Sequence, residues 1–128
     1  MAELIRLSED FWKIGDLNAL QQRMPGSIRR VFYIYDVGEM QRAGHRHVQT
    51  WHAMTCIQGS CRVASTDGIS EQEFWLSGPR DCLIISPEDW HIMDNFTEGT
   101  ILLVFSNQPY DPDDYVYQKP ASNTAIEA

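Results

Sequence analysis

Short runs of β-branched, aromatic and aliphatic residues recur along most of the chain at a spacing of roughly ten residues, with Gly and Pro between them. Apolar runs of this length, alternating or continuous, predict β-strands rather than helices. The predicted strands are Arg30–Val37, Trp51–Ile57, Cys61–Ser65, Glu71–Leu76, Cys82–Ser86, His91–Phe96 and Thr100–Asn107. The pattern therefore predicts an all-β fold, either a sandwich or a barrel.

Helix signals are confined to the first part of the chain. Ser8 is suited to cap a short turn, and residues 16–22 are compatible with a second one before Pro25 and Gly26 end the segment. We therefore divide the chain into a short N-terminal arm (residues 1–27), a β-barrel (residues 28–120) and a small polar tail that we expect to be frayed (residues 121–128).

Two turns are predicted between the strands. Asp67-Gly68 is a strong hairpin signal, because Gly accepts a positive φ without strain. Cys56 and Cys61 flank a second turn at Gln58-Gly59, so their side chains could face each other across a hairpin. A disulfide is feasible there, but in a reducing compartment we expect two packed thiols.

The composition is that of one ordinary globular domain, and its charge argues against several functions. The 128 residues are 43% hydrophobic and carry a formal charge of −8, which disfavours binding to nucleic acid or anionic lipid. The longest apolar run, Ile101–Phe105, is far shorter than the roughly 20 residues of a membrane span. Because the first residues also lack the apolar stretch of a signal peptide, we expect a cytoplasmic protein without a membrane partner.

Basic residues are unevenly distributed. Five of the 10 basic residues lie between positions 23 and 46, where only Asp36 and Glu39 oppose them. They are Arg23, Arg29, Arg30, Arg42 and Arg46. A basic segment in an acidic protein indicates either a site for a small anion or a solvated basic face, and charge alone leaves both open.

The four histidines are the main candidates for chemistry. His45 and His47 form an H-x-H pair, and on a strand residues i and i+2 point to the same face, so both imidazoles are expected to enter one cavity. His52 follows closely, and His91 comes just after Pro87. The spacing resembles the two short motifs of the cupins, with His52 in place of the usual Glu and with Gly59 completing the first motif. Asn95 completes the second motif. The implied fold is a cupin double-stranded β-helix, a jelly-roll barrel with its site at the mouth.

A closer resemblance covers about 90 residues. The chain resembles the cupin-type sugar 3,4-ketoisomerases, a family also called WxcM-like. The matching segments are IRRVFYIYD (Ile28–Asp36), RAGHRH (Arg42–His47), CIQGSCRV (Cys56–Val63), Asp67-Gly68, Pro87 with Trp90 and Met93, Leu102–Val104, and YDPDDY (Tyr110–Tyr115). The resemblance implies an isomerase that acts on dTDP-4-keto-6-deoxyglucose for dTDP-3-amino sugars of surface glycans.

The same resemblance implies roles for individual residues. His45 would be the base at carbon, and His47 would relay protons or stabilise the enediolate oxygen. Arg30 and Arg42 would hold the diphosphate, because guanidinium groups pair bidentately with phosphate oxygens. Phe32 and Trp90 are candidates to stack on the sugar or the base. In the family this chemistry needs no metal or other cofactor.

Two departures from the family pattern keep other functions open. Phe32 stands where the family has a Tyr whose hydroxyl is thought to serve the proton shuttle, and by strand alternation Tyr33 faces the other way. His52 stands where a Gln is common. One alternative is therefore a metal-binding cupin with Zn, Ni, Fe or Cu on His45, His47, His52 and His91. The other is a sugar-binding cupin without catalysis.

We also expect a homodimer. The family forms dimers in which N-terminal strands cross to the partner, and an exposed Phe11-Trp12 pair in the arm would favour burial by such an exchange.

Overall fold

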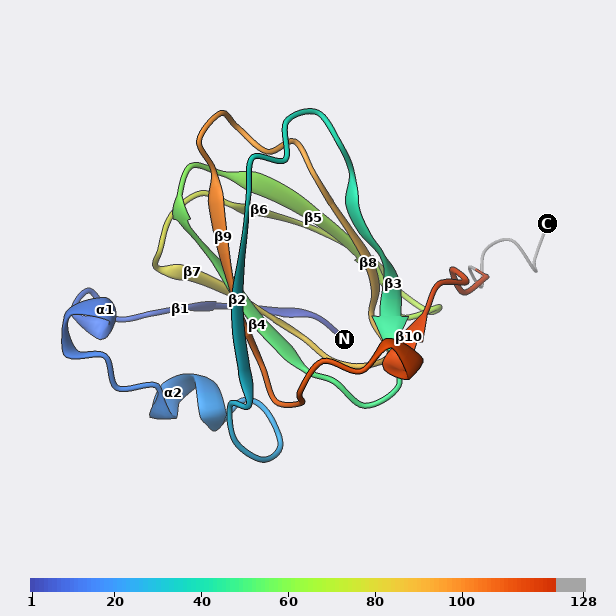
Figure 1. Ribbon diagram of the computed structural model, residues 1–128, viewed down its shortest axis with the longest axis horizontal. Helices are drawn as coiled ribbons and strands as arrows, with labels where there is room; N and C mark the ends of the chain where they lie inside the picture. The colour runs from blue at the N-terminus through green and yellow to red at the C-terminus, as the bar shows by residue number, and fades with distance from the viewer. Residues whose placement is uncertain (122–128) are drawn as a thin grey trace.

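The computed structural model describes residues 1–121 and consists of two antiparallel sheets packed face to face (Figure 1). The first sheet has the order β1 (Glu3–Arg6), β7 (Asp81–Ile85), β4 (His52–Gln58), β9 (Ile101–Ser106) and β2 (Arg30–Tyr35). The second has the order β10 (Tyr115–Val116), β3 (Arg42–His47), β8 (Trp90–Asp94), β5 (Cys61–Thr66) and β6 (Glu71–Leu76). The predicted all-β jelly-roll is confirmed. The predicted frayed tail (residues 121–128) lies outside the described residues, apart from Ala121.

The main core lies between the two sheets and follows from the alternation of side chains. In β2 the residues are alternately half-buried and exposed, so Phe32 and Ile34 face the core while Tyr33 and Tyr35 face outward, as predicted. The central strands β4, β7 and β9 supply the fully buried residues, including Met54, Leu83, Leu102 and Val104. Cys56 and Cys61 are buried free thiols with Sγ atoms 3.5 Å apart, so the expectation of packed thiols is confirmed.

The N-terminal arm packs against its own barrel. Its first strand, β1, pairs antiparallel with β7 and was not predicted, because a strand of four residues with a single half-buried side chain shows no alternation. The helices α1 (Phe11–Ile14) and α2 (Asn18–Gln21) follow and cover the outer face of the first sheet. Asp10 rather than Ser8 precedes α1, and no side chain caps that helix.

The aromatic pair of the arm packs against its own chain, with Phe11 buried and Trp12 half-buried. Phe11 is buried, and the Trp12 ring stacks on Phe105 at 6.0 Å between centroids. The Trp12 Nε1 also donates a hydrogen bond of 2.6 Å to the carbonyl of Pro79. The Phe11-Trp12 pair is therefore packed within its own chain, and this reason for exchanging the arm between subunits is not supported.

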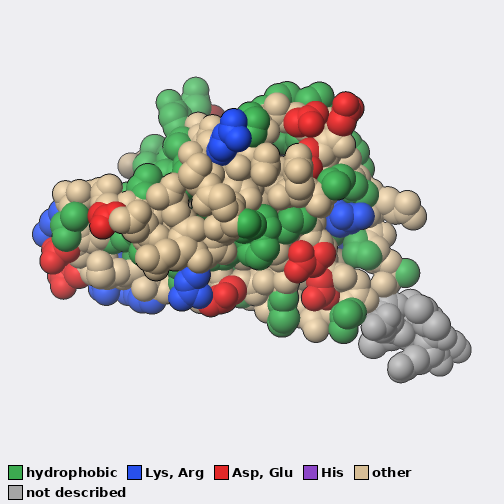
Figure 2. Space-filling model, turned by 90° about the horizontal axis from the view of Figure 1, so that it is seen from below, with side chains coloured by type: hydrophobic (Ala, Val, Ile, Leu, Met, Phe, Trp, Pro, Cys, Tyr) green, Lys and Arg blue, Asp and Glu red, His purple; other side chains and the backbone are tan. Residues whose placement is uncertain are grey.

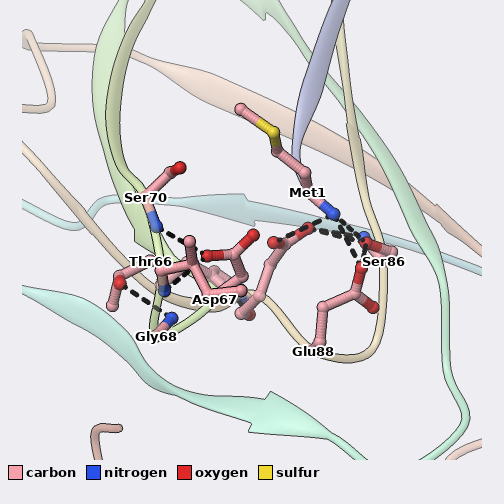
Figure 3. Close-up of polar contacts among 10 residues, drawn as sticks. Met1, Thr66, Asp67, Gly68, Ser70, Ser86 and Glu88 are labelled. Atoms are coloured by element: carbon pink, nitrogen blue, oxygen red, sulfur yellow. Dashed lines mark hydrogen bonds and ion pairs between the residues drawn. The ribbon is translucent and has the colours of Figure 1, made fainter. Parts of the chain in front are cut away.

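Two turns next to the sheets depend on particular residues. Gly59 has a φ of +74°, and a Cβ there would lie 2.2 Å from the Thr100 Oγ1, so the turn between β4 and β5 requires glycine. At the predicted Asp67-Gly68 turn, the Asp67 carboxylate accepts hydrogen bonds of 2.8 Å from the backbone N–H of Ile69 and of Ser70 (Figure 3). Figure 3 also shows the Met1 amino group donating to Ser86 and Glu88, beside the end of β7.

The described part of the chain contains only short helices. None of them is long and apolar enough to cross a membrane. Acidic and basic side chains are interspersed on the face shown in Figure 2, and no histidine is visible on that face. This agrees with the burial of His47, His52 and His91 inside the barrel.

Candidate functional site

Four imidazoles meet between the two sheets. His45 and His47 project inward from β3, His91 lies beside His45 in the β3–β8 register, and His52 comes from β4 in the opposite sheet. A register shift after Ala43 precedes the H-x-H pair. Ring centroids are 4.9 Å apart for His45 and His47, 5.2 Å for His45 and His91, and 4.7 Å for His47 and His52. The predicted convergence of all four histidines is therefore found in the structure.

A cavity of about 410 Å³ adjoins this cluster and is lined mainly by β2 and β3. Among its lining residues are Arg30 and Phe32 of β2, Arg42 and His45 of β3, and His52 of β4. His91 also lines it, so the structure brings together six of the residues that the sequence singled out. His47 lies beside them, because its ring packs against both His45 and His52.

A buried carboxylate holds His47 in one orientation. The Asp114 Oδ2 lies 3.0 Å from the His47 Nδ1, and the hydroxyl of Thr50 donates to the same oxygen. The other oxygen of Asp114 accepts a hydrogen bond of 2.9 Å from the backbone N–H of Gln49. Since a carboxylate only accepts hydrogen bonds, Nδ1 carries the proton and Nε2 presents a lone pair.

The ionisation of this pair follows from its surroundings. Burial opposes a charge on Asp114, yet the hydrogen bonds from Thr50, Gln49 and His47 hold the pKa of Asp114 below its ordinary value. Burial lowers the pKa of His47, and the Asp114 carboxylate partly offsets that effect. At neutral pH the pair is therefore a neutral imidazole backed by a carboxylate, an arrangement that stabilises a proton once it is taken up at Nε2.

The other three histidines lack a carboxylate partner among the described residues. Burial, followed by the neighbouring His91 and His47 rings, lowers the pKa of His45 to about 3. Burial lowers the pKa of His91 to about 4, and its Nδ1 lies 3.0 Å from the backbone carbonyl of Asp89, to which it donates. Burial also lowers the pKa of His52 well below the ordinary value, and neither ring nitrogen has a partner.

We predict that the free energy of unfolding falls as the pH drops from 6.5 to 5. A histidine with a lowered pKa in the folded state binds its proton more readily when unfolded, so its stability contribution is present above pH 6.5 and lost below it. His91 alone accounts for about 2 kcal/mol over this interval. Urea unfolding at several pH values measures the slope, and His52→Gln should reduce proton uptake on unfolding by about one. An unchanged stability at pH 5 would show that these rings are not held neutral.

The arginines divide into two groups. Arg30 and Arg42 line the cavity, and neither has an ion pair within residues 1–121. Arg30 lies over the rings of Phe32 and Tyr110, at 4.3 and 5.0 Å from their centroids. Arg23 is instead paired with Glu3 at 2.6 Å, remote from the cavity. The anion site predicted from the basic segment is thus reduced to two arginines.

Trp90 does not belong to this cavity. It precedes His91 on β8, so its side chain points to the outer face of the second sheet when His91 points inward. Its Nε1 donates a hydrogen bond of 3.0 Å to the carbonyl of Tyr117, and Lys119 lies over its ring. Trp90 is therefore not among the residues that line the histidine cavity, and its stacking on the sugar or the base stays a prediction.

Sequence reasoning missed two residues of the site. Asp114 ends the short helix η1 (Pro112–Asp114), and the pairing of β10 with β3 places Tyr115 opposite His47. The ring of Tyr115 packs on both His45 and His47, at 4.7 Å between centroids in each case, and lines the cavity. Both residues lie in the YDPDDY segment, which was used only as a sign of family resemblance.

The four-histidine metal alternative is not supported by the placement of the rings. Within residues 1–121, no three side chains of His, Cys, Asp or Glu are arranged to hold a metal ion. We therefore derive no chemical step through a metal.

The fold and the site define a cupin-type barrel with neutral imidazoles beside two arginines that form no ion pair within the described residues. A family model described as WxcM-like, C-terminal (FdtA) matches residues 2–124, and the chain belongs to this family. It is 37% identical over 107 residues to TDP-4-oxo-6-deoxy-alpha-D-glucose-3,4-oxoisomerase of Aneurinibacillus thermoaerophilus, covering 81% of this chain and 77% of that protein.

Solved structures show the same relationship. The TDP-quinovose 3,4-ketoisomerase WlaRB of Campylobacter jejuni is similar with a TM-score of 0.79 and 28% identity, covering 91% of this chain and 92% of that one. The sugar 3,4-ketoisomerase QdtA of Thermoanaerobacterium thermosaccharolyticum, in complex with TDP, gives a TM-score of 0.76 and 29% identity. That match covers 91% of this chain and 88% of QdtA.

Proposed function

We propose that this protein is a nucleotide-sugar 3,4-ketoisomerase that acts on a dTDP-4-keto-6-deoxyhexose. The observation that carries the proposal is the His47–Asp114 pair beside a cavity lined by two unpaired arginines, in a chain of this family. Relatives named as 3,4-oxoisomerase and 3,4-ketoisomerase support the reaction, and a relative in complex with TDP supports the nucleotide. Turnover of dTDP-4-keto-6-deoxyglucose by the purified protein, before and after treatment with a chelator, is the direct test.

The reaction requires two kinds of proton movement. A base removes the proton at C3, which lies α to the ketone, and leaves an enediolate; the proton is then delivered to C4. The hydroxyl proton moves in the same sense, from the oxygen at C3 to the oxygen at C4, so that the ketone forms at C3 and the alcohol at C4. Imidazoles with free lone pairs supply groups for both movements, so no metal or organic cofactor is needed for the proton balance.

We assign the carbon base to His47 and the proton relay at oxygen to His45. The resemblance led to the opposite expectation, but within residues 1–121 His47 is the one histidine of the cluster with a carboxylate on its Nδ1, which stabilises the imidazolium that forms when Nε2 takes the proton. His45, with its pKa lowered to about 3, binds a proton weakly and suits hydrogen bonding to a sugar oxygen. Tyr115 packs against both rings and supports their orientation.

Arg30 and Arg42 are proposed to bind the diphosphate. Their positive charges are not neutralised by carboxylates in the described residues, and the aromatic rings on either side of Arg30 hold its guanidinium in place. Phe32 contributes to the same wall of the cavity and packs against His52.

We predict that Arg42→Ala weakens binding of dTDP by about 1.5–3 kcal/mol, the range for hydrogen bonds to a charged group. Arg42 is exposed at the cavity, so the loss should become smaller at high salt. Isothermal titration calorimetry measures the dissociation constant. Arg6→Ala, which removes an exposed arginine paired with Asp81, is the matched control and should leave it unchanged. Equal dissociation constants for Arg42→Ala and the wild type would remove Arg42 from the anion site.

We also propose a homodimer, supported by the free edge of the first sheet rather than by the arm. β2 lies at this edge, and its outward residues Val31, Tyr33 and Tyr35 are exposed. An exposed edge strand with apolar side chains is suited to pair with a second copy. Light scattering should give a dimer at micromolar concentration, and Tyr33→Lys should shift it toward the monomer. A monomeric wild-type protein would contradict this proposal.

A further inference from the structure

His52 is a buried polar side chain that the proposed proton transfers do not use. It lies on β4, at the start of the strand, and lines the cavity from the sheet opposite His45 and His91. Only 4% of its surface is exposed. Its ring packs edge-on against His47 at 4.7 Å and against Phe32 at 6.0 Å between centroids.

Neither nitrogen of this imidazole has a hydrogen-bond partner in the described structure. A buried polar group without a partner destabilises the folded protein, and most such groups in proteins are satisfied. Two further ring nitrogens of the same cluster, the Nε2 atoms of His47 and His91, also lack partners. The unpartnered nitrogens therefore belong to one cluster of packed imidazole rings beside the cavity, which indicates that a polar ligand supplies the missing hydrogen bonds there.

We propose that His52 is a substrate-binding residue that holds a hydroxyl or keto oxygen of the sugar ring inside the barrel. The inference rests on the proposed function and adds to it a specificity-determining residue for the sugar, distinct from the arginines that bind the diphosphate. A neutral imidazole offers one N–H donor and one lone pair, the combination that a sugar hydroxyl can satisfy.

The surroundings of His52 favour a neutral oxygen over a charged group. His47, His91, His45 and Arg30 all disfavour a positive charge on His52, and burial has the largest effect in the same direction. The ring of Phe32 and the burial of His52 make a neutral oxygen the better partner for this neutral imidazole. Arg30 and Arg42 supply the positive charges of the cavity lining, and His52 supplies an uncharged donor and acceptor.

A ligand-binding role and a structural role for His52 predict different effects of substitution on stability. If His52 were a structural core residue, replacing it should destabilise the protein. If its nitrogens form hydrogen bonds only with a bound substrate, an apolar side chain of similar size should be tolerated or should stabilise the ligand-free protein. The same change should weaken recognition of the sugar, because the substrate oxygen then loses its partner in a buried site.

The test compares His52→Leu with His52→Gln in the full chain. Leu removes both polar atoms, whereas Gln keeps a donor and an acceptor. For His52→Leu we expect a melting temperature equal to or above that of the wild type and a dissociation constant for dTDP within twofold. We expect kcat/KM for the dTDP-keto sugar to fall about 10- to 100-fold. His52→Gln should recover most of that loss.

Each other result is decisive. Unchanged kcat/KM in His52→Leu overturns the inference, and so does a lower melting temperature in both variants with parallel loss of dTDP binding, which would mark a structural residue. Absence of turnover in the wild-type protein would contradict the proposed function itself, whereas normal wild-type turnover together with an indifferent His52→Leu variant contradicts only the role of His52.

Discussion

Replacing His47 with Asn is expected to abolish isomerisation while preserving the fold and the binding of dTDP. His47 is the one histidine of the cluster with a carboxylate behind it in the described structure, so no neighbouring ring can take up the carbon proton equally well. The expected loss of kcat is on the order of 10²–10⁴-fold, as for removal of a general base. Steady-state kinetics together with calorimetric titration of dTDP measures both quantities.

His45→Asn is the matched comparison for this experiment. Because we place His45 at the sugar oxygens, this variant should turn over slowly but still exchange the carbon-bound proton with solvent deuterium. His47→Asn should show no exchange at carbon. The reverse pattern, with exchange lost in His45→Asn and kept in His47→Asn, would return the role of carbon base to His45.

Asp114→Asn is expected to have the second largest effect. An amide would present an N–H to the His47 Nδ1, so the ring would rotate or adopt the other tautomer, with its proton on Nε2 and no lone pair left there to take up the substrate proton. We expect kcat to fall about 10²–10³-fold with little change in the binding of dTDP, since a misoriented base acts on the chemical step. Steady-state kinetics across a range of pH measures this.

The pH profile separates this role from a structural one. The Asp114 carboxylate raises the pKa of His47 against the effect of burial, so its removal should move the acidic limb of the kcat/KM profile to lower pH. Asp113→Asn, an exposed carboxylate in the same short helix, is the control and should leave the limb unchanged. A loss of activity without a shifted limb would mean that Asp114 only maintains the fold.

The strands and the histidine cluster could be predicted because both depend on local spacing. Alternation in IRRVFYIYD predicted correctly that Phe32 faces inward and Tyr33 outward, and the H-x-H spacing placed His45 and His47 in one cavity. The same rule excludes Trp90 from the site once His91 is placed there, since neighbouring residues of a strand face opposite ways.

The partner of His47 could not be predicted from spacing. Asp114 is 67 residues away along the chain, and it reaches His47 only because β10 pairs with β3 at the edge of the second sheet. The charge pattern was likewise insufficient, because the exposed Arg23 is paired with Glu3 instead of lying at the cavity. The His47–Asp114 contact and the Arg23–Glu3 ion pair both join residues far apart in the sequence, and local spacing does not predict such contacts.

Metal-free isomerisation with His47 as the carbon base is tested most directly by NMR in D₂O. The conversion of dTDP-4-keto-6-deoxyglucose is followed with the purified, chelator-treated protein and with its His47→Asn variant. We expect the wild type to form the 3-keto isomer without added metal and His47→Asn to form none. Absence of the 3-keto product with the wild type, or product formation that requires a metal ion, would contradict this mechanism.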